Sequence, residues 1–278
     1  MTEPLSIPAL VAAALAEDLG ERGDVTSALL VPAVLRAAGA VVARAPGVLA
    51  GRAVGEEVLR QAGVEGDWLV ADGARLAVGD VVCRVEGPAR AVLAAERTLL
   101  NALSRLSGIA TLTARYVEAA APARVLDTRK TTPGWRVLEK AAVAAGGGTN
   151  HRMGLHDMVL VKDNHLALAG EGLVEAVARA RRELPGVAVE VEADDLAGVE
   201  RALAAGADWI LLDNMDPDAM RAAVALAAGR ARLEASGGMT LEGARAAAAT
   251  GVDAVSVGAL THSAPALDLA LDLDAAGR

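Results

Sequence analysis

Polar residues and glycines follow six apolar runs in the second half of the chain. The runs cover residues 124–127, 158–161, 187–191, 209–212, 232–235 and 254–257. The residues that follow them are, in order, Thr128-Arg129-Lys130, Lys162, Glu192, Asp213, Ser236-Gly237-Gly238 and Gly258-Ala259. In β/α barrels the loops after the strands meet at one mouth, where the chemistry is assembled. We therefore expect these residues to gather at one candidate active site.

Five basic residues of this region stand out against an acidic chain. The 278 residues include 27 basic and 36 acidic side chains, a formal net charge of −9. The basic residues in question are Arg129, Lys130, His151, Arg152 and Lys162. Their grouping predicts a ligand with several negative charges, because arginine binds carboxylates and phosphates with two parallel hydrogen bonds. The alternative is a solvated patch paired with surface acids.

Glu192 and Asp213 form a pair of carboxylates on successive strands among these cations. Three roles are open to them: to bind ribose hydroxyls, to hold Mg²⁺, or to stabilise positive charge at a reacting carbon. Simple ion pairs with the neighbouring lysines and arginines are the fourth reading.

Two glycine-containing loops predict an anion-binding cradle. Ser236-Gly237-Gly238 precedes Thr240, which is a good helix N-cap, and Gly258 follows the last apolar run. Backbone N–H groups near a helix N-terminus bind anions. Left-handed turns alone also explain many glycine pairs. The position of these loops after the last two strands, where β/α barrels often bind phosphate, favours the anion-binding interpretation.

The spacing of the apolar runs indicates repeated β/α units and a parallel sheet. Six strands fall short of the eight of a full barrel, so we expect an α/β protein with an incomplete β/α barrel. A doubly wound open sheet is the alternative, although no Gly-x-Gly-x-x-Gly follows the first strand. Residues 25–86 predict a small α+β unit, and the pattern of residues 90–120 predicts a long connecting helix.

Composition excludes several functions. Aromatic residues make up 1% of the chain, with no Phe, so few side chains are available to stack on the bases of a nucleic acid. Negative charge disfavours nucleic acid and anionic membranes as partners. The longest uncharged stretch of the second half, residues 254–267, is too short to cross a membrane, and the single cysteine, Cys83, allows no internal disulfide. We expect a cytoplasmic protein.

Several ordered motifs resemble those of the quinolinate phosphoribosyltransferase family, and the resemblance covers essentially the whole chain. They include residues 127–136 (DTRKTTPGWR), 146–152 (GGGTNHR), 160–165 (LVKDNH), 211–214 (LLDN), 234–238 (EASGG) and 257–262 (VGALTH). The resemblance implies an N-terminal α/β sandwich with a connecting helix (1–112), a β/α barrel (113–265) and a C-terminal segment that returns to the first domain (266–278). It also implies a homodimer whose active site is shared between chains.

The resemblance further implies a reaction. Phosphoribosyl pyrophosphate and quinolinate would give nicotinate mononucleotide, pyrophosphate and CO2, with Mg²⁺ as cofactor, in the biosynthesis of NAD. Lys130, Lys162, Glu192 and Asp213 would act in catalysis, with Glu192 and Asp213 near the metal. The quinolinate-binding residues would be Arg97 (from the neighbouring chain), Thr128, Arg129, Lys130, His151, Arg152 and Lys162. The phosphoribosyl group would meet Glu192, Asp213, Ser236, Gly237, Gly238, Gly258, Ala259, Leu260 and His262.

Three other functions remain open. A related phosphoribosyltransferase could use another acceptor, although His151, Arg152 and Arg97 favour a dicarboxylate. A Schiff-base aldolase would use Lys162 as its nucleophile. A ligand-binding protein would bind a phosphorylated anion without turnover.

Overall fold

The computed structural model describes residues 6–170 and 172–274, and within them the chain divides into two compact units. The first contains residues 6–112, 133–147 and 264–274, and the second contains residues 113–132 and 148–263 without residue 171. Residues 133–147, which the resemblance places in the second domain, group with the first unit. Residues 1–5 and 275–278 of the expected domains lie outside the described part.

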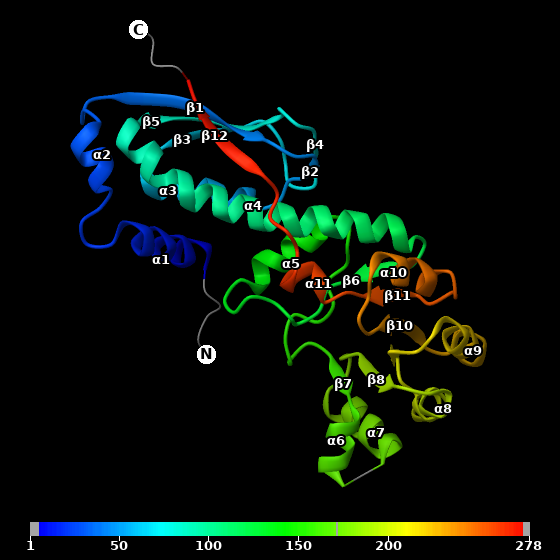
Figure 1. Cartoon of the computed structure of the whole chain (residues 1–278). Helices are drawn as coiled ribbons and strands as arrows, with labels where there is room; N and C mark the ends of the chain where they lie inside the picture. Colours follow the sequence, from blue (N-terminus) through cyan, green and yellow to red (C-terminus); the bar gives the residue numbers. More distant parts are fainter. Residues whose placement is uncertain (1–5, 171, 275–278) are drawn as a thin grey trace. The chain divides into compact units, whose positions relative to one another are not determined.

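An antiparallel four-stranded sheet forms the centre of the first unit (Figure 1). Its order is β12 (Leu269–Leu273), β1 (Arg36–Ala43), β5 (Val81–Pro88) and β3 (Glu65–Trp68), and a separate small sheet pairs β2 (Gly47–Val48) with β4 (Arg75–Leu76). The C-terminal strand β12 pairs along β1, with Leu271 opposite Val41. Strand β5 alternates buried Cys83 and Val85 with exposed Arg84 and Glu86, so one face of the sheet packs against the core.

Two of the five helices that the structure describes in the first unit begin at a side chain that caps them. The helices are α1 (Ile7–Leu19), α2 (Val25–Leu30), α3 (Arg52–Ala62), the long α4 (Ala89–Ala120), which continues into the second unit, and α5 (Arg136–Ala145). Ser6 caps α1 and Asp24 caps α2, each by accepting a hydrogen bond from a backbone N–H of the first turn. In α4, Leu99, Leu103 and Leu106 are fully buried at spacings of three and four residues, which confirms the predicted connecting helix.

The second unit is a six-stranded parallel sheet with one helix or more after most strands. Its order is β6 (Arg124–Leu126), β11 (Ala254–Ser256), β10 (Arg232–Ser236), β9 (Trp209–Asp213), β8 (Val189–Ala193) and β7 (Val159–Val161). The helices are α6 (Asp163–Ala169), α7 (Leu173–Glu183), α8 (Leu196–Ala205), α9 (Pro217–Ala227), α10 (Leu241–Ala248) and the short α11 (Ala259–His262). All six predicted strands are present.

The sheet is that of an incomplete β/α barrel, as the sequence predicts. All five strand pairs are parallel. Strands β6 and β7 lie at the two ends of the order and do not pair with each other in the described ranges. The barrel is therefore open beside β7, whereas a closed barrel would need further strands there.

No helix in the described part of the chain is both long and apolar enough to span a membrane.

Candidate active site

Lys162, Glu192, Asp213 and Ser236 lie at the carboxyl ends of four parallel strands. The structure extends three strands by one or two residues, so Glu192, Asp213 and Ser236 belong to β8, β9 and β10 rather than to the loops after them. Ser236 pairs directly with Asp213 across the sheet. The strand backbone therefore fixes these side chains more firmly than loops would.

Lys162 and Glu192 form an ion pair across the neighbouring strands β7 and β8. The Lys162 ammonium contacts Oε2 of Glu192, and both side chains are partly exposed. Lys162 follows directly after β7, and Val161 of that strand pairs with Val191 of β8. A carboxylate and a cation thus meet at the edge where the strands end.

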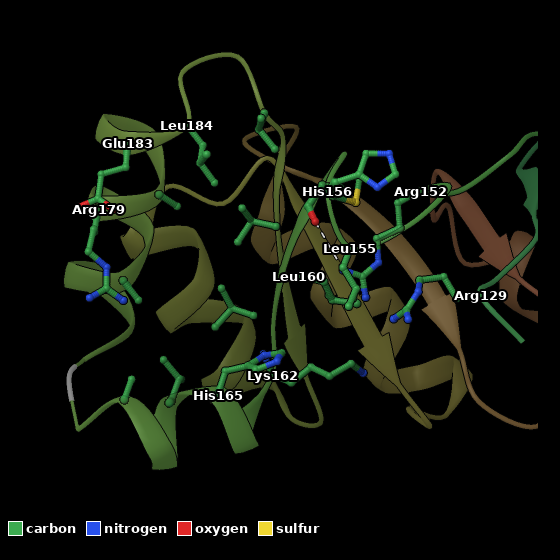
Figure 2. A pocket seen from close by; sticks show the side chains of 18 residues that line it. Arg129, Arg152, Leu155, His156, Leu160, Lys162, His165, Arg179, Glu183 and Leu184 are labelled. Atoms are coloured by element: carbon green, nitrogen blue, oxygen red, sulfur yellow. Dashed lines mark hydrogen bonds between the residues drawn. The ribbon is translucent and has the colours of Figure 1, made fainter. Parts of the chain in front are cut away.

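Arg129, Arg152 and Lys162 line one pocket of about 530 Å³ beside β7. Figure 2 shows the three side chains with their nitrogen atoms directed toward one another. Burial lowers the pKa of the Arg152 guanidinium, and the positive charge of Arg129 lowers it further. Mutual repulsion of this kind is relieved by an anionic ligand, so the pocket is suited to bind a group with more than one negative charge.

Residues after β6 and β11 meet at the same mouth. The backbone N–H of Lys130 donates to Oγ1 of Thr128 at 3.0 Å, and Oγ1 of Thr261 donates to the Lys130 carbonyl oxygen at 2.8 Å. A Cβ atom at Gly258 would lie 3.1 Å from Cδ of Lys130 and 3.2 Å from Nε2 of His262. The structure therefore brings Lys130, Gly258 and His262 together. Ala259 opens α11, and the side chain of Leu260 is fully buried.

The loops after β9 and β10 are shaped by residues with positive φ. Asn214 has φ of 54°, and Gly237 and Gly238 have φ of 108° and 46°. A Cβ atom at Gly237 would lie only 2.1 Å from Oδ1 of Asn214, so glycine is required there. Thr240 caps α10 by accepting a hydrogen bond from the Gly243 N–H at 3.0 Å, as predicted. These loops line a second pocket of about 220 Å³.

The side chain of His151 lies against two carboxylates of the parallel sheet. Its side chain is 8% exposed, and Nε2 lies 3.1 Å from Oε2 of Glu190 and 3.2 Å from Oε2 of Glu234. Burial alone would lower the pKa of His151, but the neighbouring carboxylates of Glu190 and Glu234 outweigh it and raise that pKa. His151, which is predicted to contact substrate, is thus held by carboxylates of two strands of the sheet.

Sequence reasoning missed Glu190 and Glu234. Both lie inside apolar runs that predict strands, and both are almost completely buried. A carboxylate within a buried strand is itself a signal, because such a group needs a hydrogen-bonded or charged partner. The sequence did not say which residue that partner is.

Arg97 lies in the first unit, whereas every other predicted site residue lies in the second. It lines a pocket of about 310 Å³ together with Glu17, Asp18 and Trp135.

Two groups of residues have donor atoms that suit a metal ion. Mg²⁺ is commonly held by one or two carboxylates together with substrate phosphates, and Glu192 and Asp213 offer carboxylates at strand ends near the glycine loop. Asp213 also accepts a hydrogen bond from the Asn214 side chain at 3.0 Å, which orients it. The second group is His151, Glu190 and Glu234, whose ligand atoms lie within 4.8 Å of one another.

Comparisons with known proteins agree along the whole chain. Residues 24–107 match the family of the quinolinate phosphoribosyl transferase N-terminal domain, and residues 109–272 match that of the C-terminal domain. The chain is 45% identical over 269 residues to the nicotinate-nucleotide pyrophosphorylase [carboxylating] of Mycobacterium leprae, with 94% of each chain covered. It is 43% identical over 240 residues to the probable enzyme of that name from Bacillus subtilis, covering 84% of this chain and 82% of the relative.

Solved structures give the same result. NadC from Streptococcus pyogenes superposes with a TM-score of 0.91 at 41% identity, covering 99% of this chain and 98% of that one. The nicotinate-nucleotide pyrophosphorylase from Francisella tularensis superposes with a TM-score of 0.91 at 35% identity, covering 99% and 100%.

The fold, the cationic mouth and these matches define an enzyme, a phosphoribosyltransferase built on an incomplete β/α barrel. The chain belongs to the quinolinate phosphoribosyl transferase family.

Proposed function

We propose that this enzyme transfers the phosphoribosyl group of phosphoribosyl pyrophosphate to quinolinate with loss of CO2, and so makes nicotinate mononucleotide for NAD biosynthesis. The observation that carries the proposal is the pocket lined by Arg129, Arg152 and Lys162, with Glu192 paired to Lys162 at its edge. It combines a place for a dianionic acceptor with a carboxylate close to the sugar.

The acceptor end depends on the cations. Quinolinate carries two adjacent carboxylates on a pyridine ring, and the two guanidinium groups offer bidentate hydrogen bonds to them. Thr128 and Lys130 complete this side, because the Lys130 backbone is held by Thr128 and Thr261.

The sugar end depends on the carboxylates and the glycine loops. Glu192 and Asp213 bind the ribose hydroxyls, and the loops of Ser236–Gly238 and Gly258–Leu260, with His262, hold the 5′-phosphate through backbone N–H groups. The bond between the anomeric carbon and pyrophosphate breaks as the bond to the ring nitrogen forms. Positive charge develops on the sugar during this displacement, and the fixed carboxylates stabilise it.

Mg²⁺, held by Glu192 and Asp213 directly or through water, would neutralise charge on the pyrophosphate leaving group. Lys130 and Lys162 add positive charge on the same side.

Decarboxylation follows from the product of the first step. The bond between the ring and the carboxylate next to the nitrogen breaks and CO2 leaves. The electron pair stays on the ring carbon until it binds a proton. The adjacent pyridinium nitrogen stabilises that pair, and the cations of the pocket help. No nucleophile of the protein is required.

The finer proposals are a homodimer in which Arg97 of one chain completes the site of the other, and a cytoplasmic location. The position of Arg97 supports the homodimer, because Arg97 alone of the predicted site residues lies in the first unit, apart from the others. The single cysteine, which is buried, is compatible with a reducing compartment.

The proposal is tested by incubating the protein with quinolinate, phosphoribosyl pyrophosphate and Mg²⁺ and following nicotinate mononucleotide and CO2. Nicotinate serves as the control acceptor. Absence of product, or product from nicotinate alone, contradicts the proposal. Borohydride trapping of Lys162 with a carbonyl substrate would instead support an aldolase.

A further inference from the structure

Two buried carboxylates lie one layer below the mouth. Glu190 precedes Glu192 by two residues on β8, and Glu234 precedes Ser236 by two residues on β10. Alternate residues of a strand share a face, so both carboxylates face the same side of the sheet as the mouth residues. Their side chains are 0% and 2% exposed.

His151 is the partner of both carboxylates. Its Nε2 atom lies 3.1 Å from Glu190 and 3.2 Å from Glu234. Oε1 of Glu190 and Oε2 of Glu234 are both buried and have no hydrogen-bond partner within the described ranges, so Glu234 meets the ring as an ion-pair contact while Glu190 hydrogen-bonds to it. Isolated buried carboxylates are costly, so the imidazole ring is held firmly between the two strands.

His151 in turn holds Arg152. The backbone N–H of Arg152 donates to Nδ1 of His151 at 2.7 Å, and the backbone N–H of His151 donates to Oδ1 of the buried Asp127 at 2.9 Å. Residue 151 is thus tied to groups from β8 and β10 and to Asp127, which follows β6. Arg152 is the next residue along the chain, and its side chain lines the 530 Å³ pocket.

The same cluster offsets charge at the mouth. The pKa of Arg152 is lowered by burial and by Arg129, whereas the negative charge of Glu190 opposes this shift. Glu190 therefore offsets part of the repulsion between Arg152 and Arg129.

We propose that Glu190 and Glu234 are positioning residues for the acceptor half of the site: through His151 they fix the position of Arg152, and with it the grip on the acceptor's carboxylates. This role rests on the proposed function. Neither carboxylate touches substrate, and the phosphoribosyl half does not depend on them.

The test uses Glu190→Gln and Glu234→Gln in the full chain, each of which removes the charge and keeps the shape. The matched control is Glu139→Gln, because Glu139 is a fully buried carboxylate of the first unit that pairs with Arg105 at 2.7 Å. Each site variant is expected to raise KM for quinolinate about tenfold, equivalent to about 1.4 kcal/mol. The KM for phosphoribosyl pyrophosphate and kcat are expected to stay within about twofold. The control should lower the melting temperature without changing either KM.

A second readout needs no turnover. The ring N–H of His151 that faces the two carboxylates should give a downfield proton resonance, assigned by its loss in His151→Gln. It should shift or vanish in both site variants, stay in Glu139→Gln, and shift when quinolinate is added to the unaltered protein. If the enzyme does not use quinolinate, the resonance still responds to the glutamine variants, so failure of the proposed function is distinguished from failure of this proposal.

Four results overturn it. The first is a drop in stability alone in both site variants, with both KM values unchanged. The second is an equal rise in both KM values, and the third is a resonance that does not respond to quinolinate in a protein that turns quinolinate over. Stoichiometric divalent metal in the purified protein that is lost in Glu234→Gln also overturns it, because His151 would then be a metal ligand.

Discussion

The hydroxyl group of Tyr116 donates a hydrogen bond to the carbonyl oxygen of Met239 at 3.0 Å. Tyr116 lies near the end of α4 and is 6% exposed, and Met239 follows the glycine pair after β10. The end of the long helix therefore braces the loop to which the phosphate cradle is assigned.

Tyr116→Phe removes this brace and leaves the ring in place. We expect a loss of about 1 kcal/mol in the free energy of unfolding, because one partly buried hydrogen bond is lost. The KM for phosphoribosyl pyrophosphate should rise several-fold and that for quinolinate should not. Urea unfolding and steady-state kinetics check both, and a selective rise in the quinolinate KM would contradict the assignment of this loop.

Gly237→Ala is expected to abolish binding of phosphoribosyl pyrophosphate. The added methyl would lie 2.1 Å from Oδ1 of Asn214, and φ is already positive. The matched control is Gly206→Ala, which has φ of 79° with open space around it. The control should lose only about 1–2 kcal/mol of stability from backbone strain, measured by thermal unfolding, and should keep its affinity for substrate by calorimetry.

Glu192→Gln and Arg152→Ala should affect different kinetic constants. Loss of the Glu192 charge is expected to lower kcat about 100-fold, because stabilisation of the charged transition state is lost, with little change in quinolinate affinity. Arg152→Ala should chiefly raise KM for quinolinate. Glu56→Gln is the control, since Glu56 pairs with Arg52 in an exposed ion pair on α3. The reverse pattern would show that the two half-sites are assigned wrongly.

Mixed dimers test the shared site. Arg97→Ala and Lys130→Ala chains are each expected to be inactive, and mixing them should restore about a quarter of the activity, since half of the dimers then contain one intact site. Mixing Lys130→Ala with Glu192→Gln is the control. Both of those residues lie in the second unit, so no site is intact and activity stays absent. No recovery in the first mixture would speak against a site completed by Arg97 of a second chain.

The buried thiol of Cys83 is expected to make the free energy of unfolding fall at high pH. Its side chain is fully buried, and burial raises the pKa of its thiol to about 12 from the ordinary 9.0. The unfolded chain releases this proton first, so the contribution is complete below pH 9 and is lost as the pH rises toward 12. Urea unfolding of the wild type and Cys83→Ala across this range should show a steeper decline for the wild type. A thiol reagent at pH 8 should label Cys83 only after unfolding, and labelling of the native protein would contradict this account.

Much of the second unit could be predicted from local signals. Each buried parallel strand is a short apolar run, and the spacing of the runs leaves room for one helix or more between them. The order of the strands in the sheet is not local, because β6 pairs with β11, 130 residues away at Arg124 and Ala254. Side-chain packing and right-handed crossovers decide that order.

The sequence by itself determined the parallel sheet, the residues at its strand ends and the glycine that the loop after β10 requires. Only the tertiary structure decided what those residues touch. It pairs Lys162 with Glu192, and it places His151 in contact with Glu190 and Glu234. The reason is that the period-two pleat tells which face a side chain takes, whereas its partner comes from a strand or loop tens of residues away, set by register and packing across the sheet.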